Sequence, residues 1–325
     1  MFCPLRRDSV SAHKETQFTS ILLSPISLLL YLREITDTTA TNNSLLTMKN
    51  IIKTISEGLA TTYTDGEIKA LTRILAIELL GISQMAYFLK EEVTLCTEQQ
   101  ALLDNAIARL QKQEPIQYIL GYCDFDGLRF KVNSSTLIPR PETSELVEWV
   151  ASEATGKERI LDIGTGSGCI AISIAHRLPE ASVEAWDIST EALKTAKENN
   201  LDNNTNVAFT NVDILSHVPG EKRFDIIVSN PPYIKEVEKN EMEANVLDWE
   251  PHTALFVPDH DPLLFYRTIA EKGKNMLHPG GKMFFEINRS HGKETMDMLA
   301  SLGYTAIELR KDFADNDRMI KAILP

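Results

Sequence analysis

The sequence has few cysteines and lacks any long uninterrupted apolar run. Its 325 residues include four scattered cysteines, with no Cys-x-x-Cys pair and no cluster of cysteine with histidine: Cys3, Cys96, Cys123 and Cys169. This pattern argues against a disulfide framework and against a zinc site, and we expect a reducing, cytoplasmic setting. No run approaches the roughly 18 apolar residues that a membrane span requires.

Basic residues are also fewer than acidic residues. Lysine and arginine number 33 against 46 aspartates and glutamates, which gives a net charge of −13 at pH 7. Non-specific binding to nucleic acid requires a positive surface, so this charge balance argues against it without excluding a local basic groove. The negative net charge is compatible with a basic protein partner. A hydrophobic content of 43% and the chain length indicate about two globular domains.

The first 47 residues differ in character from the rest. They are rich in serine and threonine and carry four basic and four acidic residues, so the net charge resides in residues 48–325. The apolar stretch at 21–32 resembles part of a signal peptide but lacks a small-residue cleavage site. We therefore expect residues 1–47 to be an over-called start upstream of Met48, or a disordered leader.

Three further segments follow. Apolar residues recur at three- and four-residue spacing over 48–121, which predicts a small bundle of four or five helices, with Thr64 and Thr97 as N-caps. Residues 122–140 alternate in polarity around Asp-Gly, which predicts a β-hairpin linker between domains. A helix from Pro141 to Val150 then opens the last domain, 141–325.

The last domain alternates strands and helices. Seven apolar segments predict strands: RILDIG, SVEAWDI, NVAFTNVD, FDIIVSN, GKMFFEIN, TAIELRK and MIKAILP. Helices between most of them predict an α/β fold with a doubly wound, seven-stranded, mainly parallel sheet. Only a short loop separates the last two strands, so we expect one of them to be antiparallel.

A glycine-rich turn follows the first of these strands, before a predicted helix. It reads Gly164, Thr165, Gly166, Ser167 and Gly168. Glycines allow a ligand to approach the backbone closely, and a helix N-terminus offers free N–H groups. The dinucleotide fingerprint G-x-G-x-x-G needs a glycine where Cys169 stands, and the Gly-Lys-Ser/Thr of a P-loop is absent. The spacing is G-x-G-x-G instead, and a glycine-rich turn alone does not identify a particular cofactor.

The next two strands end in candidate ligand contacts. Asp187 ends the second strand, where an acidic residue can accept both hydroxyls of a ribose; it can also serve as a helix N-cap. Asp213 and Ile214 end the third strand, where they can flank an adenine, the carboxylate at its amine and the side chain on its ring. An ordinary loop aspartate is the alternative for Asp213.

The fourth strand ends in Asn230, Pro231, Pro232 and Tyr233. Prolines cannot extend a ladder, so they stop the strand and stiffen the turn. Asn230 then lies at the carboxyl end of the sheet, where α/β folds bind ligands, and offers both donors and an acceptor. With the ring of Tyr233, this corner is suited to a planar group; a rigid turn without function is the alternative.

This order of motifs resembles the class I S-adenosylmethionine-dependent methyltransferases that methylate a nitrogen conjugated to a π-system. More specifically, TLIPRPETSELVEWV, DIGTGSGCIAISIA, SNPPYI and EPHTALF resemble the release factor glutamine methyltransferase (HemK/PrmC) family over about residues 48–325. Ser167 stands where the family commonly has threonine, and an aromatic residue is often found near Ile214. The resemblance implies S-adenosylmethionine as cofactor, no metal, and methylation of N5 of the glutamine in the Gly-Gly-Gln motif of class 1 release factors.

In this interpretation the catalytic residues are Asn230, Pro231 and Tyr233. The Asn230 oxygen and the Pro231 carbonyl accept the two amide protons, which moves electron density onto the nitrogen. Pro232 and Tyr233 complete the substrate contacts, and Asn230 also adjoins the cofactor. We expect the helical bundle to recognise the release factor, or else only to stabilise the sheet.

Three competing functions make different predictions. An adenine-N6 or guanine-N2 methyltransferase acting on nucleic acid uses the same corner but needs a basic surface. Residues 231–250 carry six acidic residues against Lys235 and Lys239. A non-catalytic binding module is expected to have a damaged loop or corner, and neither is damaged. An NAD-dependent oxidoreductase is disfavoured by Cys169. Arg140 and Glu142 are candidates to close over the cofactor, with a helix cap as the alternative for Glu142.

Overall fold

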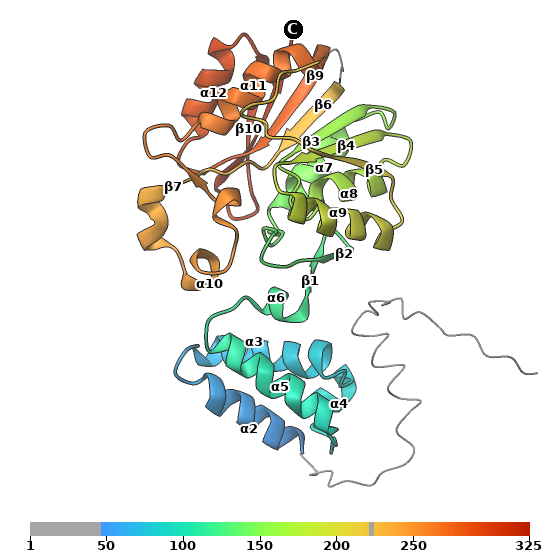
Figure 1. Cartoon of the computed structure of the whole chain (residues 1–325), viewed down its shortest axis with the longest axis vertical. Coiled ribbons are helices and arrows are strands. Elements are labelled where there is room, and N and C mark those ends of the chain that lie inside the picture. The colour runs from blue at the N-terminus through green and yellow to red at the C-terminus, as the bar shows by residue number, and fades with distance from the viewer. Residues whose placement is uncertain (1–46, 221–223) are drawn as a thin grey trace, which may run out of the picture. The chain divides into compact units, whose positions relative to one another are not determined.

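The computed structural model describes residues 47–220 and 224–325 (Figure 1). The predicted leader, apart from Thr47, lies outside the described residues. Among the helices that are described, none is long and apolar enough to cross a membrane.

The segment before residue 121 is helical, as predicted. It comprises α2 (Met48–Leu59), α3 (Asp65–Ile74) with a π-helical continuation (Leu75–Leu79), α4 (Gln84–Leu89), α5 (Thr97–Leu110) and the short α6 (Ile116–Leu120). Side chains spaced three and four residues apart on α2 are fully buried against α3 and α5: Met48, Ile51, Ile55 and Leu59. This apolar stripe explains why the segment forms a bundle with its own core.

One of the two predicted N-caps is confirmed. Thr64 and Glu67 form a capping box at the start of α3. The N-cap of α5 is Cys96 rather than Thr97, which is already helical. The Gln99 side chain accepts the Cys96 N–H at 3.1 Å, and this contact sets the boundary one residue earlier than the threonine predicts.

The hairpin consists of β1 (Tyr122–Phe125) and β2 (Leu128–Lys131), which pair antiparallel. Asp126 and Gly127 turn the chain with φ of 51° and 78°, the left-handed conformation that a two-residue turn of this kind requires. The hairpin occupies the first part of the predicted linker, and 132–140 forms no strand.

A seven-stranded sheet forms the centre of the remaining chain, in the order β10-β11-β9-β6-β3-β4-β5. Its strands are β3 (Arg159–Ile163), β4 (Ser182–Asp187), β5 (Val207–Asn211), β6 (Phe224–Ser229), β9 (Leu277–Glu286), β10 (Thr305–Lys311) and β11 (Asp317–Ile323). Strand β11 is antiparallel to both of its neighbours, and the pairs from β9 to β5 are parallel. The predicted fold class is confirmed.

Helices cover both faces of the sheet (Figure 1). They are α7 (Thr143–Glu153), α8 (Cys169–Arg177) and α9 (Thr190–Asp202) on one face, and α11 (Leu264–Met276) and α12 (Gly292–Ser301) on the other. Alternate strand residues serve the two cores: Ile226 and Val228 of β6 pack toward α7 and α8, and Ile227 packs toward α11. Helix α7 begins at Thr143 rather than at Pro141 and ends at Glu153 rather than at Val150.

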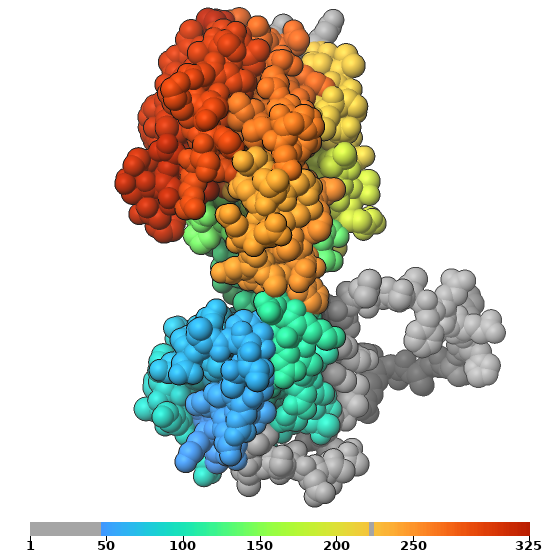
Figure 2. Space-filling model, turned by 90° about the vertical axis from the view of Figure 1, so that its left-hand side faces the viewer, coloured from blue at the N-terminus to red at the C-terminus, as the bar shows by residue number. Residues whose placement is uncertain are grey.

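A long excursion separates β6 from α11. It contains β7 (Ile234–Lys235), which pairs in parallel with β8 (Phe256–Val257), the 3-10 helices Glu236–Glu241 and His252–Ala254, and α10 (Ala244–Leu247). The 3-10 helix Glu236–Glu241 is mostly exposed and acidic, and this amber segment forms part of the surface in Figure 2.

The core predicts a stability difference between two phenylalanines. Phe284 is fully buried and packs edge-to-face on Trp149 at 5.4 Å between ring centroids, whereas Phe313 is 75% exposed. We expect Phe284→Ala to lower the free energy of unfolding by about 3–5 kcal/mol, because it leaves a cavity between the sheet and α7. Phe313→Ala is the matched control, with a change of about 0.5 kcal/mol or less. Denaturant titration of both variants measures the difference, and equal effects would contradict this packing.

Candidate active site

Three of the predicted site residues, Asn230, Gly164 and Asp187, lie in one row across the sheet. Parallel pairing aligns Ile163 with Ser229 and Trp186, and Ser229 with Phe285. The residues that come next along each strand therefore also lie side by side, in the order Glu286, Asn230, Gly164 and Asp187. The glycine turn, the amide corner and the acidic residue of β4 share the carboxyl edge of the sheet, where α/β folds place ligands.

The glycine turn is built for close approach. Gly166 and Gly168 adopt φ of 57° and 84°. A Cβ on Gly168 would lie 2.8 Å from the Ile172 side chain and 3.2 Å from Ala196 of α9, so a side chain there is excluded by packing as well as by conformation. The turn leads directly into α8, whose first N–H groups face this edge of the sheet.

Asp187 holds the turn by hydrogen bonds. One carboxylate oxygen accepts the Gly166 N–H at 2.8 Å, and the other accepts the Ser189 N–H at 2.8 Å. The N-cap of α9 is Ser189, whose hydroxyl accepts from Ala192, so the alternative role of Asp187 as a helix cap is wrong. Burial raises the pKa of Asp187. A carboxylate offers about four acceptor positions, which leaves capacity for a ligand.

Asp213 and Ile214 lie just beyond β5. The Asp213 carboxylate accepts the Leu215 N–H at 2.9 Å in a local turn, which matches the loop-residue alternative. Ile214 is buried in the cluster that contains Trp186 and Phe224. The contact of these two residues with an adenine stays a prediction.

Asp162, inside β3, is a buried carboxyl that the sequence interpretation assigned no role. One oxygen accepts the Thr165 hydroxyl at 2.6 Å, and the Ala171 N–H of α8 also bonds to the carboxyl. Burial raises the pKa of Asp162 to about 7. A buried carboxyl is costly unless it is hydrogen-bonded, and these contacts tie Asp162 to the glycine turn and to α8.

The Asn230 corner is anchored by its neighbours. The Ser229 hydroxyl donates to the Ile163 carbonyl at 2.6 Å, which ties the end of β6 to the end of β3. Pro231 is buried, and Asn230 is half-buried. The Asn230 amide makes no hydrogen bond with any described residue, so its donors and acceptor are free for a ligand.

Tyr233 makes hydrogen bonds with the last residue of β9 and with the segment just after it. Its hydroxyl donates to Glu286 at 3.4 Å, and its carbonyl accepts from the Asn288 amide at 3.2 Å. The other oxygen of Glu286 accepts the Thr143 hydroxyl at 2.6 Å, which links the corner to the start of α7. Burial raises the pKa of Glu286 to about 7. Neither Glu286 nor Asn288 was a predicted site residue. For Glu286, the sequence did hold a signal, because a carboxyl inside the apolar strand FFEIN is unusual.

Arg140 and Glu142 lie just before α7, and their closure over the cofactor stays a prediction. Arg140 pairs with Glu250, whose other oxygen accepts the Ile138 N–H at 3.1 Å. Glu250 is 3% exposed. Its ion pair with Arg140 connects two of the family-like motifs, PRPET and EPHTALF. Glu142 occupies the N-cap position of α7, but its side chain makes no capping hydrogen bond.

Beside the corner lies a cavity of about 270 Å³. Its lining combines the ring of Tyr233 with acidic, basic and apolar side chains: Ile234, Glu238, Glu241, Met242, Asn288, Arg289 and Arg318. Among the described residues there is no group of three or more potential metal ligands.

Comparison with known proteins agrees with this geometry. The family model described as methyltransferase small domain matches residues 142–248, and the PrmC N-terminal domain matches 51–121. Release factor glutamine methyltransferase of Bacteroides thetaiotaomicron is 48% identical over 277 residues, covering 85% of this chain and 99% of that protein. The protein of the same name from Flavobacterium psychrophilum is 44% identical, covering 84% and 98%.

The chain belongs to the release factor glutamine methyltransferase family. This confirms the resemblance drawn from the sequence motifs. A solved protein-(glutamine-N5) methyltransferase from Alicyclobacillus acidocaldarius is 28% identical and covers 60% of this chain and 99% of that chain, with a TM-score of 0.36. Membership identifies the chain as a methyltransferase, and the S-adenosylmethionine-dependent fold of this family implies that cofactor.

The buried carboxyl of this methyltransferase predicts a pH effect. Because the pKa of Glu286 rises from 4.5 when unfolded to about 7 when folded, its protonated form is favoured in the folded state. Its contribution to stability is therefore complete below pH 4.5 and is lost as the pH rises through about 7.

We expect Glu286→Gln, which mimics the protonated form, to flatten this decline by at most about 3 kcal/mol. Denaturant titrations from about pH 4.5 to about pH 8 measure it. The control is Glu180→Gln, whose side chain is 71% exposed. A decline that is unchanged in Glu286→Gln would show that this carboxyl is not its source.

Proposed function

We propose that the enzyme transfers a methyl group from S-adenosylmethionine to N5 of the glutamine in the Gly-Gly-Gln motif of class 1 peptide-chain release factors. The observation that carries this proposal is the Asn230 amide, which has no partner among the described residues and stands in line between the glycine turn and Glu286. The names and high coverage of its relatives support the same substrate.

The turn and its surroundings fit the cofactor. Gly166 leaves room at the backbone, and Asp187 can accept from a ribose. Asp213 and Ile214 are the proposed adenine contacts. When bound, S-adenosylmethionine supplies a methyl group that is already activated by its sulfonium centre.

The chain's own task is to make an amide nitrogen reactive. The lone pair of an amide is delocalised into its carbonyl, so the nitrogen is a poor nucleophile. The Asn230 oxygen and the Pro231 carbonyl accept its two N–H groups, raise the electron density on nitrogen and stabilise the positive charge that develops there. The same two bonds orient the nitrogen for in-line attack. Tyr233, fixed by Glu286 and Asn288, packs on the amide plane.

Asn230 is the residue to test first. We expect Asn230→Ala to lower kcat by about 100-fold or more, because it removes one of two acceptors that act on the reacting nitrogen. The affinity for S-adenosylmethionine should stay within severalfold, since Asn230 mainly holds the substrate. Steady-state kinetics and isothermal titration with the cofactor separate the two effects. Abolished cofactor binding in a folded variant would contradict this division of roles.

The substrate is tested with labelled S-adenosylmethionine. A purified class 1 release factor should accept label when its Gly-Gly-Gln glutamine is intact, and should not when that glutamine is changed to alanine. Label on RNA or DNA, with none on the release factor, would instead favour the nucleic-acid methyltransferase.

We also propose that the helical bundle recognises the release factor. Helix α4 exposes a contiguous apolar surface, with Met85 at 68% and Phe88 and Leu89 at 64%. Apolar side chains that cluster on an otherwise polar surface commonly mark protein contacts. Because the enzyme is acidic and a release factor must approach negatively charged RNA, opposite charges can assist their association.

Phe88→Ser should raise KM for the release factor by about tenfold and leave KM for S-adenosylmethionine unchanged. Phe313→Ser is the matched control, since Phe313 is 75% exposed on a different domain. Equal KM values for the release factor in both variants would show that α4 takes no part in binding.

A further inference from the structure

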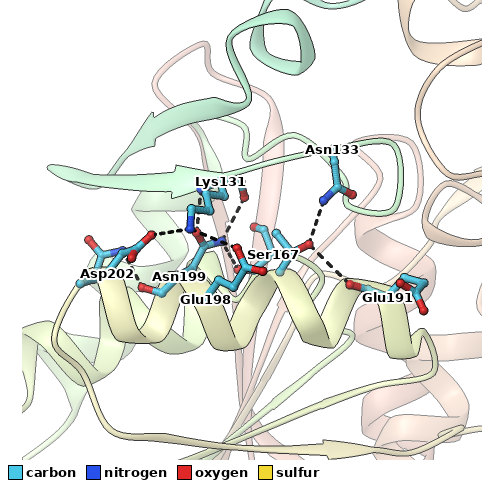
Figure 3. Close-up of polar contacts among 9 residues, drawn as sticks. Lys131, Asn133, Ser167, Glu191, Glu198, Asn199 and Asp202 are labelled. Atoms are coloured by element: carbon cyan, nitrogen blue, oxygen red, sulfur yellow. Dashed lines mark hydrogen bonds and ion pairs between the residues drawn. The ribbon is translucent and has the colours of Figure 1, made fainter. Parts of the chain in front are cut away.

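Polar side chains along one side of helix α9 bind the hairpin linker through hydrogen bonds and ion pairs. These residues recur at three- and four-residue spacing and bond to the strand β2 or the residues after it: Thr195, Glu198, Asn199, Asp202 and Asn203. Figure 3 shows Glu198, Asn199 and Asp202 of this row beneath Lys131. Most of these contacts are exposed ion pairs or single hydrogen bonds, which contribute little individually.

Asn199 differs from the others because it is fully buried and fully bonded. Its oxygen accepts the Lys131 N–H at 2.6 Å. Its amide donates to the Lys131 carbonyl at 3.0 Å and to the Ser167 carbonyl at 2.9 Å (Figure 3). One side chain thus fixes the backbone of two segments that lie 36 residues apart in sequence, the linker strand and the glycine turn.

In the glycine turn, Ser167 lies between Gly166 and Gly168. Gly166 is fixed by Asp187, and the Gly168 N–H donates to the Thr165 carbonyl at 2.8 Å. The bond from Asn199 completes this set, because it fixes the peptide plane between Ser167 and Gly168. This peptide directly precedes the first N–H groups of α8, because Gly168 is the N-cap of that helix.

We propose that Asn199 is a positioning residue, which holds the glycine turn in the conformation that binds S-adenosylmethionine and couples it to the linker strand. This inference rests on the proposed function, since it takes the turn as the cofactor site. Coupling is reciprocal: a cofactor that orders the turn also strengthens the hold of Asn199 on Lys131.

Asn199→Asp tests the inference with an isosteric change. The aspartate keeps the acceptor for the Lys131 N–H but places an oxygen against two carbonyl oxygens. Asn203→Asp is the matched control at the C-cap of the same helix, because the Asn203 amide donates to the Arg129 and Asn199 carbonyls, each at 2.9 Å, and makes no contact with the turn. Circular dichroism at the assay temperature confirms that each variant is folded.

We expect Asn199→Asp to raise KM and Kd for S-adenosylmethionine about tenfold and to leave kcat at saturating cofactor within about threefold. Asn203→Asp should leave both constants within about twofold. Unchanged affinity in Asn199→Asp, or an equal loss in the two variants, would overturn the inference. Failure of the wild-type enzyme to bind S-adenosylmethionine would instead overturn the proposed function.

Hydrogen exchange of the wild-type enzyme gives a second test that needs no variant. Saturating S-adenosylmethionine should slow exchange of the Lys131 amide, whose acceptor is Asn199. The Arg159 amide, which donates to Asp225 at 2.8 Å at the opposite edge of the sheet, should be unaffected. Unchanged exchange at Lys131, with the cofactor bound, would show that the turn and the linker are not coupled.

Discussion

The parallel register of the central strands is the constraint on which the site depends. Pairing of Ile163 with Ser229, and of Ser229 with Phe285, leaves no freedom in where the next residue of each strand lies. Three loops with unrelated sequences therefore meet in one row. A shift of one residue in any strand would turn its side chains to the other face and separate Asn230 from the glycine turn. The large apolar cores on both faces hold this register, so they support function as well as stability.

Polar groups along this edge are fixed by backbone contacts. Asp187 and Asn199 bond mainly to N–H and carbonyl groups of the turn and the linker, and Asn288 bonds to the carbonyl of Tyr233. Such bonds order the backbone that surrounds the site without occupying the Asn230 amide. Two buried carboxyls, Asp162 and Glu286, flank this region. Their raised pKa values show that burial disfavours their charged forms.

Much of this arrangement could be predicted from sequence. Apolar runs and their spacing located all seven strands and the helical bundle, and the glycine turn and the Asn-Pro-Pro-Tyr corner lie at the carboxyl edge of the sheet as expected. The errors concern local hydrogen bonds. Thr97 has the residue type of an N-cap, but Gln99 places the boundary at Cys96. Separately, no local pattern indicated that Arg140 pairs with Glu250, which lies 110 residues away, and the contact of Arg140 with the cofactor stays a prediction.

The residues that sequence reasoning missed share a physical property. Glu286, Asn288 and Asn199 act through partners that are distant in sequence, so no local pattern identifies them. A buried charge inside FFEIN was the available signal, because a carboxyl is rarely buried without a specific contact. Asn199 gave no signal, since an asparagine near a helix C-terminus is ordinary in sequence. Its contacts emerge only when helix, turn and linker are placed together, because its partners Lys131 and Ser167 lie in segments that are separate from α9 in sequence.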